Sequence, residues 1–393
     1  MKKAFDMSDL GLLCFYLGVE VRQDASGIAL RQTHYAKLIL ELSGMMGCNK
    51  AQMKKAFDMS DLGLLCFYLG VEVRQDASGI ALRQTHYAKH ILELGGMMGC
   101  NPAHTPMEEW LKLSWDSTAE EVNTTYYWRL IRSLRYLVHT RPDLAFAIRY
   151  VSLFMERPTM EHLQDVKRIL RYVVGTLDYG LHYGRAPNKA RFVGYCDSDL
   201  ADDVDTSKST IGTMFFLDDC LVGWQSLKQK GVALSSCETE YIATTTIATQ
   251  ALWLSRMLAE LLGRKVDVVE LKVDNKSALA LAKNPIFHER SKHIRIKYHF
   301  IRDCLEDGSI KASHIATTDQ LADILTKSLG KTKFQEMRER IGLQQITCIL
   351  LCCNLLFRLL SLVDAIHIKT PFVLFQWMGM NALIVYVLAA SCL

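Results

Sequence analysis

The sequence predicts an α/β protein, and three observations support that prediction. Apolar residues make up 50% of the 393 positions and charged residues 22%, a balance typical of globular chains with a buried core. From about residue 190 onward, short β-prone runs alternate with longer runs whose apolar residues recur at helical spacing. Aspartates directly follow two of the β-prone runs, at the strand ends where open α/β sheets place their sites.

Composition and charge exclude several classes of protein. The formal net charge is only +4, so the chain is not a polycation and any surface for nucleic acid must be a local patch. Its 12 cysteines have no framework spacing, which excludes a small disulfide scaffold and favours reduced thiols in an intracellular protein. No apolar run precedes the first acidic residue, so we expect no cleaved signal peptide.

The N-terminal part of the chain contains a tandem duplication. Residues 1–49 and 53–101 are nearly the same sequence, offset by 52 positions. Repeats that stack into solenoids diverge while they keep their core positions, so two nearly identical copies indicate a recent duplication or an assembly error rather than a repeat architecture. Once one copy and the hydrophobic last part of the chain (344–393) are set aside, the remaining sequence is long enough for about two domains.

Each copy predicts a strand, a turn, a second strand and a helix. In the second copy, residues 65–73 are apolar and β-prone, residues 76–79 form a turn, and residues 80–82 resume the strand. The helix is expected over residues 86–97, because the Gly-Cys-Asn-Pro run at 99–102 ends it.

A helical region is expected after an irregular polar stretch. Residues 103–122 show no clear periodicity, whereas residues 124–184 predict two or three helices punctuated by Pro142 and Pro158. Basic residues are frequent there, and three of them, spaced three apart, share one helix face. This face is either solvated or a surface that contacts phosphate groups, and charge alone favours the first interpretation. The three residues are Arg129, Arg132 and Arg135.

The α/β part is expected to contain five strands and four helices in the order β-β-β-α-β-α-α-β-α. Short turns separate the first three strands, and a long helix with apolar residues along one face precedes the fourth. The expected strands cover residues 192–196, 210–217, 221–225, 266–273 and 310–315, and the expected helices cover residues 238–262, 276–282, 293–305 and 319–328.

The last part of the chain differs in composition. Residues 370–393 carry no charge, and residues 372–393 are long enough to span a bilayer. One interpretation is read-through sequence with no place in the folded protein, and the other is a membrane tail anchor, which Gln376 and Asn381 weaken. The first is favoured, so a membrane partner is the alternative rather than the expectation.

Four acidic residues of the α/β part are candidates for a metal site. Carboxylates gathered in one pocket repel each other and stay ionised only when cations neutralise them, and hard oxygen ligands suit Mg²⁺ or Mn²⁺. Acids at strand ends and in first helical turns also occur as caps, so their spacing alone is weak evidence. The four residues are Asp197, Glu240, Asp274 and Asp323.

Local motifs strengthen this interpretation, because they occur in the order of a known family. Tyr-Cys-Asp-Ser-Asp-Leu-Ala begins at residue 195, Ser-Ser-Cys-Glu-Thr-Glu-Tyr at 235, Val-Asp-Asn-Lys-Ser-Ala at 273 and Leu-Ala-Asp-Ile-Leu-Thr-Lys at 321. In order, they resemble the catalytic blocks of the ribonuclease H domain in copia-type LTR retrotransposon polyproteins. Thr-Arg-Pro-Asp at 140 and Leu-Arg-Tyr-Val-Val-Gly-Thr at 170 resemble the preceding segment, and residues 57–73 resemble the end of the reverse-transcriptase palm.

The resemblance implies a ribonuclease H-like five-stranded mixed sheet with flanking helices, preceded by a partial reverse-transcriptase palm and connection region. It also implies that Asp197, Glu240, Asp274 and Asp323 are catalytic ligands of two Mg²⁺ ions, with Mn²⁺ as the alternative. Glu238 competes with Glu240, which is preferred because Glu-Tyr-Ile-Ala matches the family's helix turn. The expected domains are a duplicated palm fragment (1–52), the palm fragment (53–107), a helical connection (108–189), the ribonuclease H-like domain (190–343) and the hydrophobic tail (344–393).

Accessory residues are expected beside the carboxylates. Asp199 is a candidate supporting acid, and His314 is a candidate for product release or proton transfer, although a lone histidine there is more often structural. Asp202, where the family usually has glycine, adds charge beside the proposed site together with Asp203. Contacts to a nucleic-acid backbone are expected after the fourth strand, with a solvated helix face as the alternative. The candidates are Lys292, His293, Arg295 and Lys297.

These features predict a retrotransposon-derived ribonuclease H that cleaves the RNA strand of RNA–DNA hybrids by a two-metal mechanism. No polymerase activity is expected, because the sequence lacks the paired-aspartate strand that binds metal in reverse transcriptases. The alternative is a catalytically dead remnant that at most binds nucleic acid. The expected partners are the hybrid and the upstream polymerase part of a polyprotein, in the cytoplasm, the nucleus or a virus-like particle.

Overall fold

The computed structural model describes residues 66–76, 78–184, 191–262, 266–283 and 300–346, together with three strands near the N-terminus. The chain divides into two compact units between Gly63 and Leu64. Residues 347–393 of the expected tail and the four candidate backbone-contact residues at 292–297 lie outside the described residues. Within the described part, no helix is both long and apolar enough to cross a membrane.

Both copies of the repeat form the same three antiparallel strands. In the first unit, three antiparallel strands pair in chain order: β1 (Phe15–Tyr16), β2 (Val19–Asp24) and β3 (Gly27–Arg31). The second copy forms the equivalent strands in the same register: β4 (Phe67–Tyr68), β5 (Val71–Asp76) and β6 (Gly79–Arg83). Identical local sequence therefore produces identical local pairing.

The single strand expected over residues 65–73 is wrong. The chain reverses at Leu69 and Gly70, whose φ angles are 49° and 77°, so β4 and β5 are the two arms of a tight hairpin. A two-residue turn with positive φ at both positions matches the twist of the adjoining strands, and glycine adopts that conformation readily. β-Prone residues on both sides of the turn conceal it in the sequence.

The second unit contains an antiparallel sheet of order β13-β7-β6-β5-β4. Strand β7 (Tyr179–Gly184) occupies the end of the region expected to be helical, so that expectation is wrong for these residues. Strand β13 (Leu343–Gln345) pairs with β7 and follows helix α10 (Lys331–Arg340), and the sequence patterns indicated neither element.

Four helices share one hydrophobic core with this sheet. Helix α4 (Thr124–Leu137) buries Tyr127, Leu130, Ile131 and Leu134 on one face, and the side chain of Asn123 caps its N-terminus. Two short 3-10 helices, η1 (Pro142–Leu144) and η2 (Ser152–Phe154), flank α5. The helices are α3 (Thr85–Leu94), α4 (Thr124–Leu137), α5 (Ala145–Val151) and α6 (Met160–Val174).

A second, mixed sheet has the order β10-β9-β8-β11-β12, antiparallel among its first three strands and parallel from β8 to β12. The order of elements expected from residue 190 onward is confirmed up to β12. The elements are β8 (Phe192–Ser198), β9 (Thr210–Leu217), β10 (Cys220–Lys228), α7 (Ser236–Leu262), β11 (Val269–Val273), α8 (Lys276–Lys283), α9 (Phe300–Glu306) and β12 (Ile310–His314).

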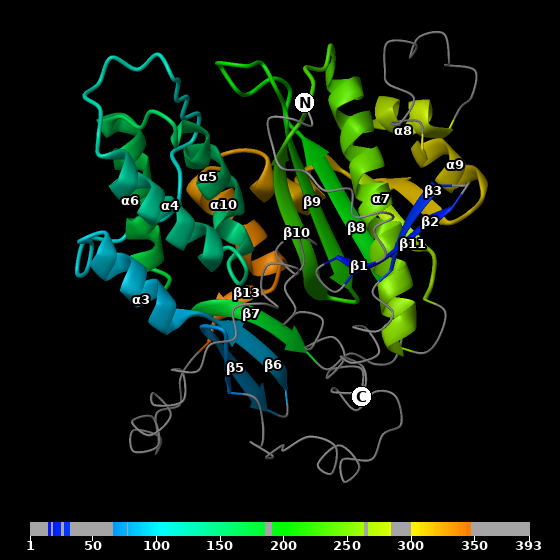
Figure 1. Cartoon of the computed structure of the whole chain (residues 1–393), viewed down its shortest axis with the longest axis horizontal. Helices are drawn as coiled ribbons and strands as arrows, with labels where there is room; N and C mark the ends of the chain where they lie inside the picture. Colours follow the sequence, from blue (N-terminus) through cyan, green and yellow to red (C-terminus); the bar gives the residue numbers. More distant parts are fainter. Residues whose placement is uncertain are drawn as a thin grey trace, which may run out of the picture. The chain divides into compact units, whose positions relative to one another are not determined.

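Both faces of the mixed sheet are covered. Helix α7 lies against β8 and β11 (Figure 1), and Phe215 of β9 belongs to the core on that side. Met214 and Phe216, its neighbours in β9, belong instead to the core formed with α3–α6. Because alternate side chains of a strand face opposite ways, burial on both faces explains the unbroken apolar run of β9.

The helix expected over residues 319–328 is instead a pair of 3-10 turns, η5 (Thr317–Asp319) and η6 (Leu321–Leu325). Gln320 lies between them in an extended conformation, with φ −71° and ψ 100°. Its side chain accepts a hydrogen bond from the backbone nitrogen of Ala322, which caps the second turn. This difference from the expected helix affects the site, because η6 carries Asp323.

Candidate metal centre

Three of the four candidate carboxylates meet at one edge of the mixed sheet. Asp197 lies near the end of β8 and Asp274 directly follows β11, and these adjacent parallel strands pair Cys196 with Val273. Glu240 projects from the first turns of α7, which packs against β8. Ligand oxygens of Asp197, Glu240 and Asp274 all lie within 4.8 Å of one another. The strand ends therefore bring together residues that are up to 77 positions apart in the sequence.

Asp323 joins this group through a lysine. The Lys327 ammonium lies 2.9 Å from Oδ1 of Asp323 and 3.7 Å from Oδ2 of Asp197. Buried Gln320 anchors the start of η6, because its Nε2 donates to the backbone oxygen of Cys196 at 2.7 Å. The sequence motif contained Lys327, but nothing in its spacing indicated that the lysine would neutralise two of the carboxylates.

A glycine allows η6 to approach the sheet this closely. Gly212 of β9 pairs with Asp197, and a Cβ atom at this position would lie 2.8 Å from the Ala322 backbone oxygen and 2.8 Å from the Thr326 side chain. Both contacts are too short for a real Cβ, and the first is to backbone. The absence of a side chain at Gly212 therefore places Asp323 and Thr326 beside Asp197.

Hydrogen bonds hold two of the carboxylates in place. The Thr326 hydroxyl donates to Oδ2 of Asp197, and the backbone nitrogen of Ser198 donates to Oε1 of Glu240 at 2.9 Å. The other oxygen of Glu240, Oε2, is buried and has no hydrogen-bond partner among the described residues. A buried carboxylate oxygen without a donor is strongly unfavourable unless a cation contacts it, so this atom fits a metal ligand.

Burial and the charges of their neighbours raise the pKa values of three of these carboxylates. Burial, and then the charges of Asp197 and Asp274, raise the pKa of Glu240 to about 9. Burial, and then Asp197, raise the pKa of Asp323 to about 7, and the same two causes raise the pKa of Asp274. Burial opposes charge on Lys327, but Asp197 and Asp323 outweigh it and raise the lysine pKa. Clustered hard oxygen donors that repel one another are the ligand set that divalent cations neutralise.

Glu238 has a different role from Glu240. Its carboxylate accepts a hydrogen bond from the backbone nitrogen of Leu234 at 2.8 Å, and its own backbone nitrogen donates to the Ser235 hydroxyl at 3.2 Å. This is a variant of the helix N-terminal capping box, in which the glutamate bonds the residue before the N-cap Ser235. The structure thus places Glu240 in the carboxylate group and uses Glu238 to begin α7.

Asp199 and His314 lie outside the carboxylate group. Asp199 accepts hydrogen bonds from the backbone nitrogens of Asp202 (3.1 Å) and Thr210 (2.7 Å), so it shapes the loop between β8 and β9, and burial raises its pKa to about 6. His314 ends β12 and is exposed. The structure does not bring either residue into contact with the three clustered carboxylates.

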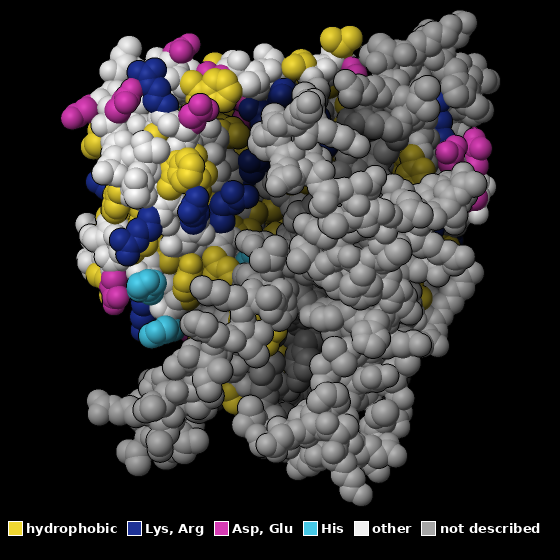
Figure 2. Space-filling view, viewed as in Figure 1, with side chains coloured by type: hydrophobic (Ala, Val, Ile, Leu, Met, Phe, Trp, Pro, Cys, Tyr) yellow, Lys and Arg dark blue, Asp and Glu magenta, His cyan; other side chains and the backbone are white. Residues whose placement is uncertain are grey.

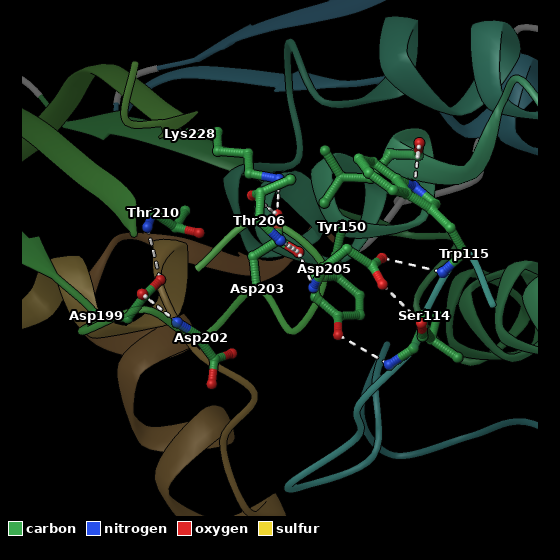
Figure 3. Close-up of polar contacts among 12 residues, drawn as sticks. Ser114, Trp115, Tyr150, Asp199, Asp202, Asp203, Asp205, Thr206, Thr210 and Lys228 are labelled. Carbon is green, nitrogen blue, oxygen red and sulfur yellow. Dashed lines mark hydrogen bonds and ion pairs between the residues drawn. The ribbon is translucent and has the colours of Figure 1, made fainter. Parts of the chain in front are cut away.

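The aspartates of the loop after β8 are held in contacts of their own rather than joining the carboxylate group. Figure 3 shows the loop beside the segment around Ser114. Asp202 and Asp203 were expected to add negative charge beside the site, but lysines neutralise both, and the neighbouring Asp205 is hydrogen-bonded. Asp202 pairs with Lys112, Asp203 pairs with Lys228, and Asp205 accepts hydrogen bonds from the Ser114 hydroxyl (2.6 Å) and the Trp115 backbone nitrogen (3.0 Å).

The metal-free protein is expected to lose stability as the pH rises from about 5 to 9. Glu240 and Asp323 have folded-state pKa values above their ordinary ones, so in this range the folded state binds more protons than the unfolded state. Stability then falls with rising pH, by up to about 1.4 kcal/mol per pH unit for each such group. Thermal unfolding in EDTA at several pH values measures this loss.

Added Mg²⁺ or Mn²⁺ should reverse the loss, since a cation that binds only the folded state stabilises it by mass action. A sample in which NaCl replaces the divalent salt at equal ionic strength is the control. A midpoint that stays level or increases with pH in EDTA would contradict the carboxylate repulsion described above.

The fold and the carboxylate group define a mixed α/β protein with an acidic centre suited to a divalent cation. A family model described as Reverse transcriptase (RNA-dependent DNA polymerase) matches residues 1–52 and 45–109. The retrovirus-related Pol polyprotein from transposon RE1 of Arabidopsis thaliana is 38% identical over 294 residues, which cover 75% of this chain and 20% of that protein. The Pol polyprotein from transposon TNT 1-94 of Nicotiana tabacum is 39% identical over 310 residues, 76% of this chain and 23% of the relative.

A shorter relative is covered over most of its length. An uncharacterized mitochondrial protein of Arabidopsis thaliana is 38% identical over 205 residues, which cover 52% of this chain and 84% of the relative. The chain belongs to the family of copia-type retrotransposon Pol polyproteins, which confirms the resemblance seen in its motifs. It spans about a fifth of the length of the two transposon polyproteins.

Proposed function

We propose that this retrotransposon-derived chain is a ribonuclease H that cleaves the RNA strand of RNA–DNA hybrids with Mg²⁺. The observation that carries the proposal is the meeting of Asp197, Glu240 and Asp274 at the carboxyl ends of two parallel strands, with ligand oxygens within 4.8 Å. The strand order, antiparallel for β8–β10 and parallel for β8, β11 and β12, supports a ribonuclease H-like sheet.

The residues of the centre fit this chemistry. When bound, two divalent ions would supply an activated water and stabilise the leaving oxygen of an in-line phosphodiester cleavage. Asp197, Glu240, Asp274 and Asp323 would hold the ions through carboxylate oxygens. Lys327 limits the repulsion between Asp323 and Asp197 while the ions are not bound, because its ammonium contacts both.

The substrate class follows from the reaction. A hybrid ribonuclease must contact ribose 2′-hydroxyls on one strand and the backbone of the other, so base specificity should be low. As part of the same proposal, residues 53–107 are a palm fragment, residues 108–189 a connection and residues 190–343 the ribonuclease H-like domain, with residues 1–52 a duplicated palm fragment. A polymerase activity is not proposed.

Asp274→Asn is expected to abolish cleavage of a labelled RNA–DNA hybrid by the full chain in Mg²⁺. The substitution removes a charged ligand from the centre while keeping its size, so the loss should exceed the roughly 10–100-fold effect of residues that only support a metal ligand. Gel separation of labelled RNA fragments measures the rate, and a DNA duplex of the same sequence tests strand selectivity.

Asp307→Asn provides the matched control, because the Asp307 carboxylate accepts a hydrogen bond from the backbone nitrogen of Ser309 and lies outside the carboxylate group. This variant should cleave at the rate of the unmodified chain. Equal activity in the Asp274→Asn variant and the unmodified chain, or no activity in either, refutes the proposed reaction.

A further inference from the structure

Helix α4 carries charge of one sign only. Its 14 residues include Arg129, Arg132 and Arg135 and no acidic residue, and all three arginines are exposed. Surface helices usually mix both signs, because opposite charges three or four positions apart stabilise each other. None of the three has an acidic partner within the described part of the chain. Figure 2 shows Lys and Arg side chains gathered over this region, with hydrophobic side chains between them.

An exposed aromatic ring lies within this basic face. The Arg132 guanidinium lies over the Trp128 ring, 5.0 Å from its centroid, and Trp128 is 38% exposed. The Trp128 indole donates to the backbone oxygen of Met155, which fixes the ring. A fixed ring under a guanidinium pre-positions that cation, which reduces the entropy lost when it binds an anion.

The basic face continues from α4 across α5 to the mixed sheet. Arg149 of α5 is half-buried, and its Nε has no hydrogen-bond partner among the described residues. Burial, and then the nearby charge of Arg135, lower the pKa of Arg149, so the two cations repel each other. An anion bound near both cations would relieve this repulsion.

Arg149 in turn lies near the carboxylate edge of the sheet. It lines a small depression together with Lys228 and the aspartates Asp202 and Asp203, at the point where β9 begins and β10 ends. The two aspartates are already paired with lysines, Asp202 with Lys112 and Asp203 with Lys228. Two residues along β9, Gly212 pairs with Asp197 of the carboxylate group. Arginines therefore extend from α4 over α5 toward the edge where the phosphodiester would be cleaved, and the acidic residues beside Arg149 are those already paired with lysines.

We propose that this arginine face, defined by Arg129, Arg132, Arg135 and Arg149, binds the sugar-phosphate backbone of the same RNA–DNA hybrid. This inference rests on the proposed function. At a rise of about 1.5 Å per residue, the three α4 arginines span about 9 Å along the helix. One strand of a duplex carries a phosphate about every 3.4 Å along its axis, so the row covers about three phosphates.

Neutralising two of these arginines should weaken hybrid binding and its salt dependence together. In the Asp274→Asn background, which prevents cleavage, R132Q/R135Q should bind the hybrid on the order of tenfold more weakly at 0.1 M salt. The slope of log K against log salt should fall by about 2, since each lost phosphate contact removes about one unit. Fluorescence anisotropy with a labelled hybrid measures both quantities on the full chain.

The controls separate this surface from general effects of charge and folding. K89Q/K311Q removes two exposed charges on α3 and β12 and should leave the slope unchanged. R132K/R135K keeps the charge and should keep the slope of log K against log salt. R135Q alone should lower that slope by about 1, so it provides the same test if the double glutamine variant unfolds. An unchanged slope in R132Q/R135Q overturns the inference. So does displacement of the labelled hybrid by polyglutamate that equals its displacement by unlabelled hybrid of the same total charge.

Failure of this inference can be told apart from failure of the proposed function. If the unmodified chain cleaves hybrid but R132Q/R135Q keeps its affinity and slope, the arginine face is wrong and the reaction stands. If the slope falls as expected but the unmodified chain cleaves nothing in Mg²⁺, the face binds nucleic acid and the proposed reaction is wrong.

Discussion

Replacing Glu240 with glutamine is expected to abolish hybrid cleavage and, at the same time, to stabilise the metal-free protein. The glutamine keeps the shape of the side chain but removes the negative charge from the carboxylate group. Cleavage should fall by more than 100-fold, because even residues that only support a ligand are worth roughly 10–100-fold. A cleavage assay in Mg²⁺ and an unfolding curve in EDTA, both at pH 8, measure the two effects.

The stabilisation follows from the environment of Glu240. The residue is 4% exposed, and burial together with Asp197 and Asp274 raises its pKa to about 9. Near pH 8 the unfolded chain ionises this group freely, whereas the folded chain resists ionisation, so folding is opposed. Glutamine removes that opposition, and we expect a gain of about 1–3 kcal/mol that disappears near pH 4.

Glu238→Gln is the matched control on the same helix. Glu238 is 8% exposed, and a glutamine oxygen can still accept the hydrogen bond from the backbone nitrogen of Leu234 that caps α7. Cleavage should therefore persist in this variant, and its stability should follow that of the unmodified chain at both pH 4 and pH 8. If Glu238→Gln loses activity and Glu240→Gln does not, the assignment of the two glutamates is reversed.

The mixed sheet could be predicted because its strands are covered on both faces. Burial on both sides selects unbroken apolar runs, as in β9, and such runs are visible without knowledge of the fold. The aspartates at the ends of β8 and β11 could be recognised for the same reason, since each follows an apolar run in the sequence. Parallel pairing of those two strands then brings Asp197 and Asp274 together.

The elements that were missed depend on tertiary contacts. Residues 319–328 have helical periodicity, but the Gln320 side chain bonds the backbone oxygen of Cys196, and the Thr326 hydroxyl bonds Asp197. These bonds hold the segment as short turns against the sheet. Lys327 acquires its contacts with two carboxylates only in that arrangement, so no local pattern could have indicated them.

Helix α10 was missed for a different reason. Its ten residues are mostly charged or polar, and it buries Phe334, Met337 and Arg338. Such a short apolar stripe gives no reliable period. Its packing depends on residues far away in the sequence, because Phe334 contacts the Tyr172 ring and Arg338 donates to the Tyr172 hydroxyl at 3.1 Å.

Asp143→Ala is expected to lower the free energy of unfolding by about 3–5 kcal/mol, because it leaves a buried guanidinium without its counter-charge. Arg141 donates to both oxygens of Asp143, at 2.9 and 2.8 Å, and the two side chains are 3% and 0% exposed. Arg141 also donates to Thr176, and the Tyr172 hydroxyl donates to Asp143 at 2.6 Å. Urea unfolding followed by circular dichroism measures the change.

Two comparisons show whether the loss arises from an uncompensated charge or from the ion pair itself. The double variant R141M/D143L replaces both partners with apolar side chains. It should recover part of the lost free energy of unfolding, since an intact buried ion pair adds less stability than the removal of one partner takes away.

An exposed ion pair provides the second comparison. Glu121→Ala breaks a pair with Arg157 whose side chains are 60% and 72% exposed, and it should change the free energy of unfolding by less than about 1 kcal/mol. If Asp143→Ala were no more destabilising than Glu121→Ala, the Arg141–Asp143 pair would not hold η1 against the end of α6. The burial of both side chains and their bonds to Tyr172 and Thr176 lead us to expect the opposite.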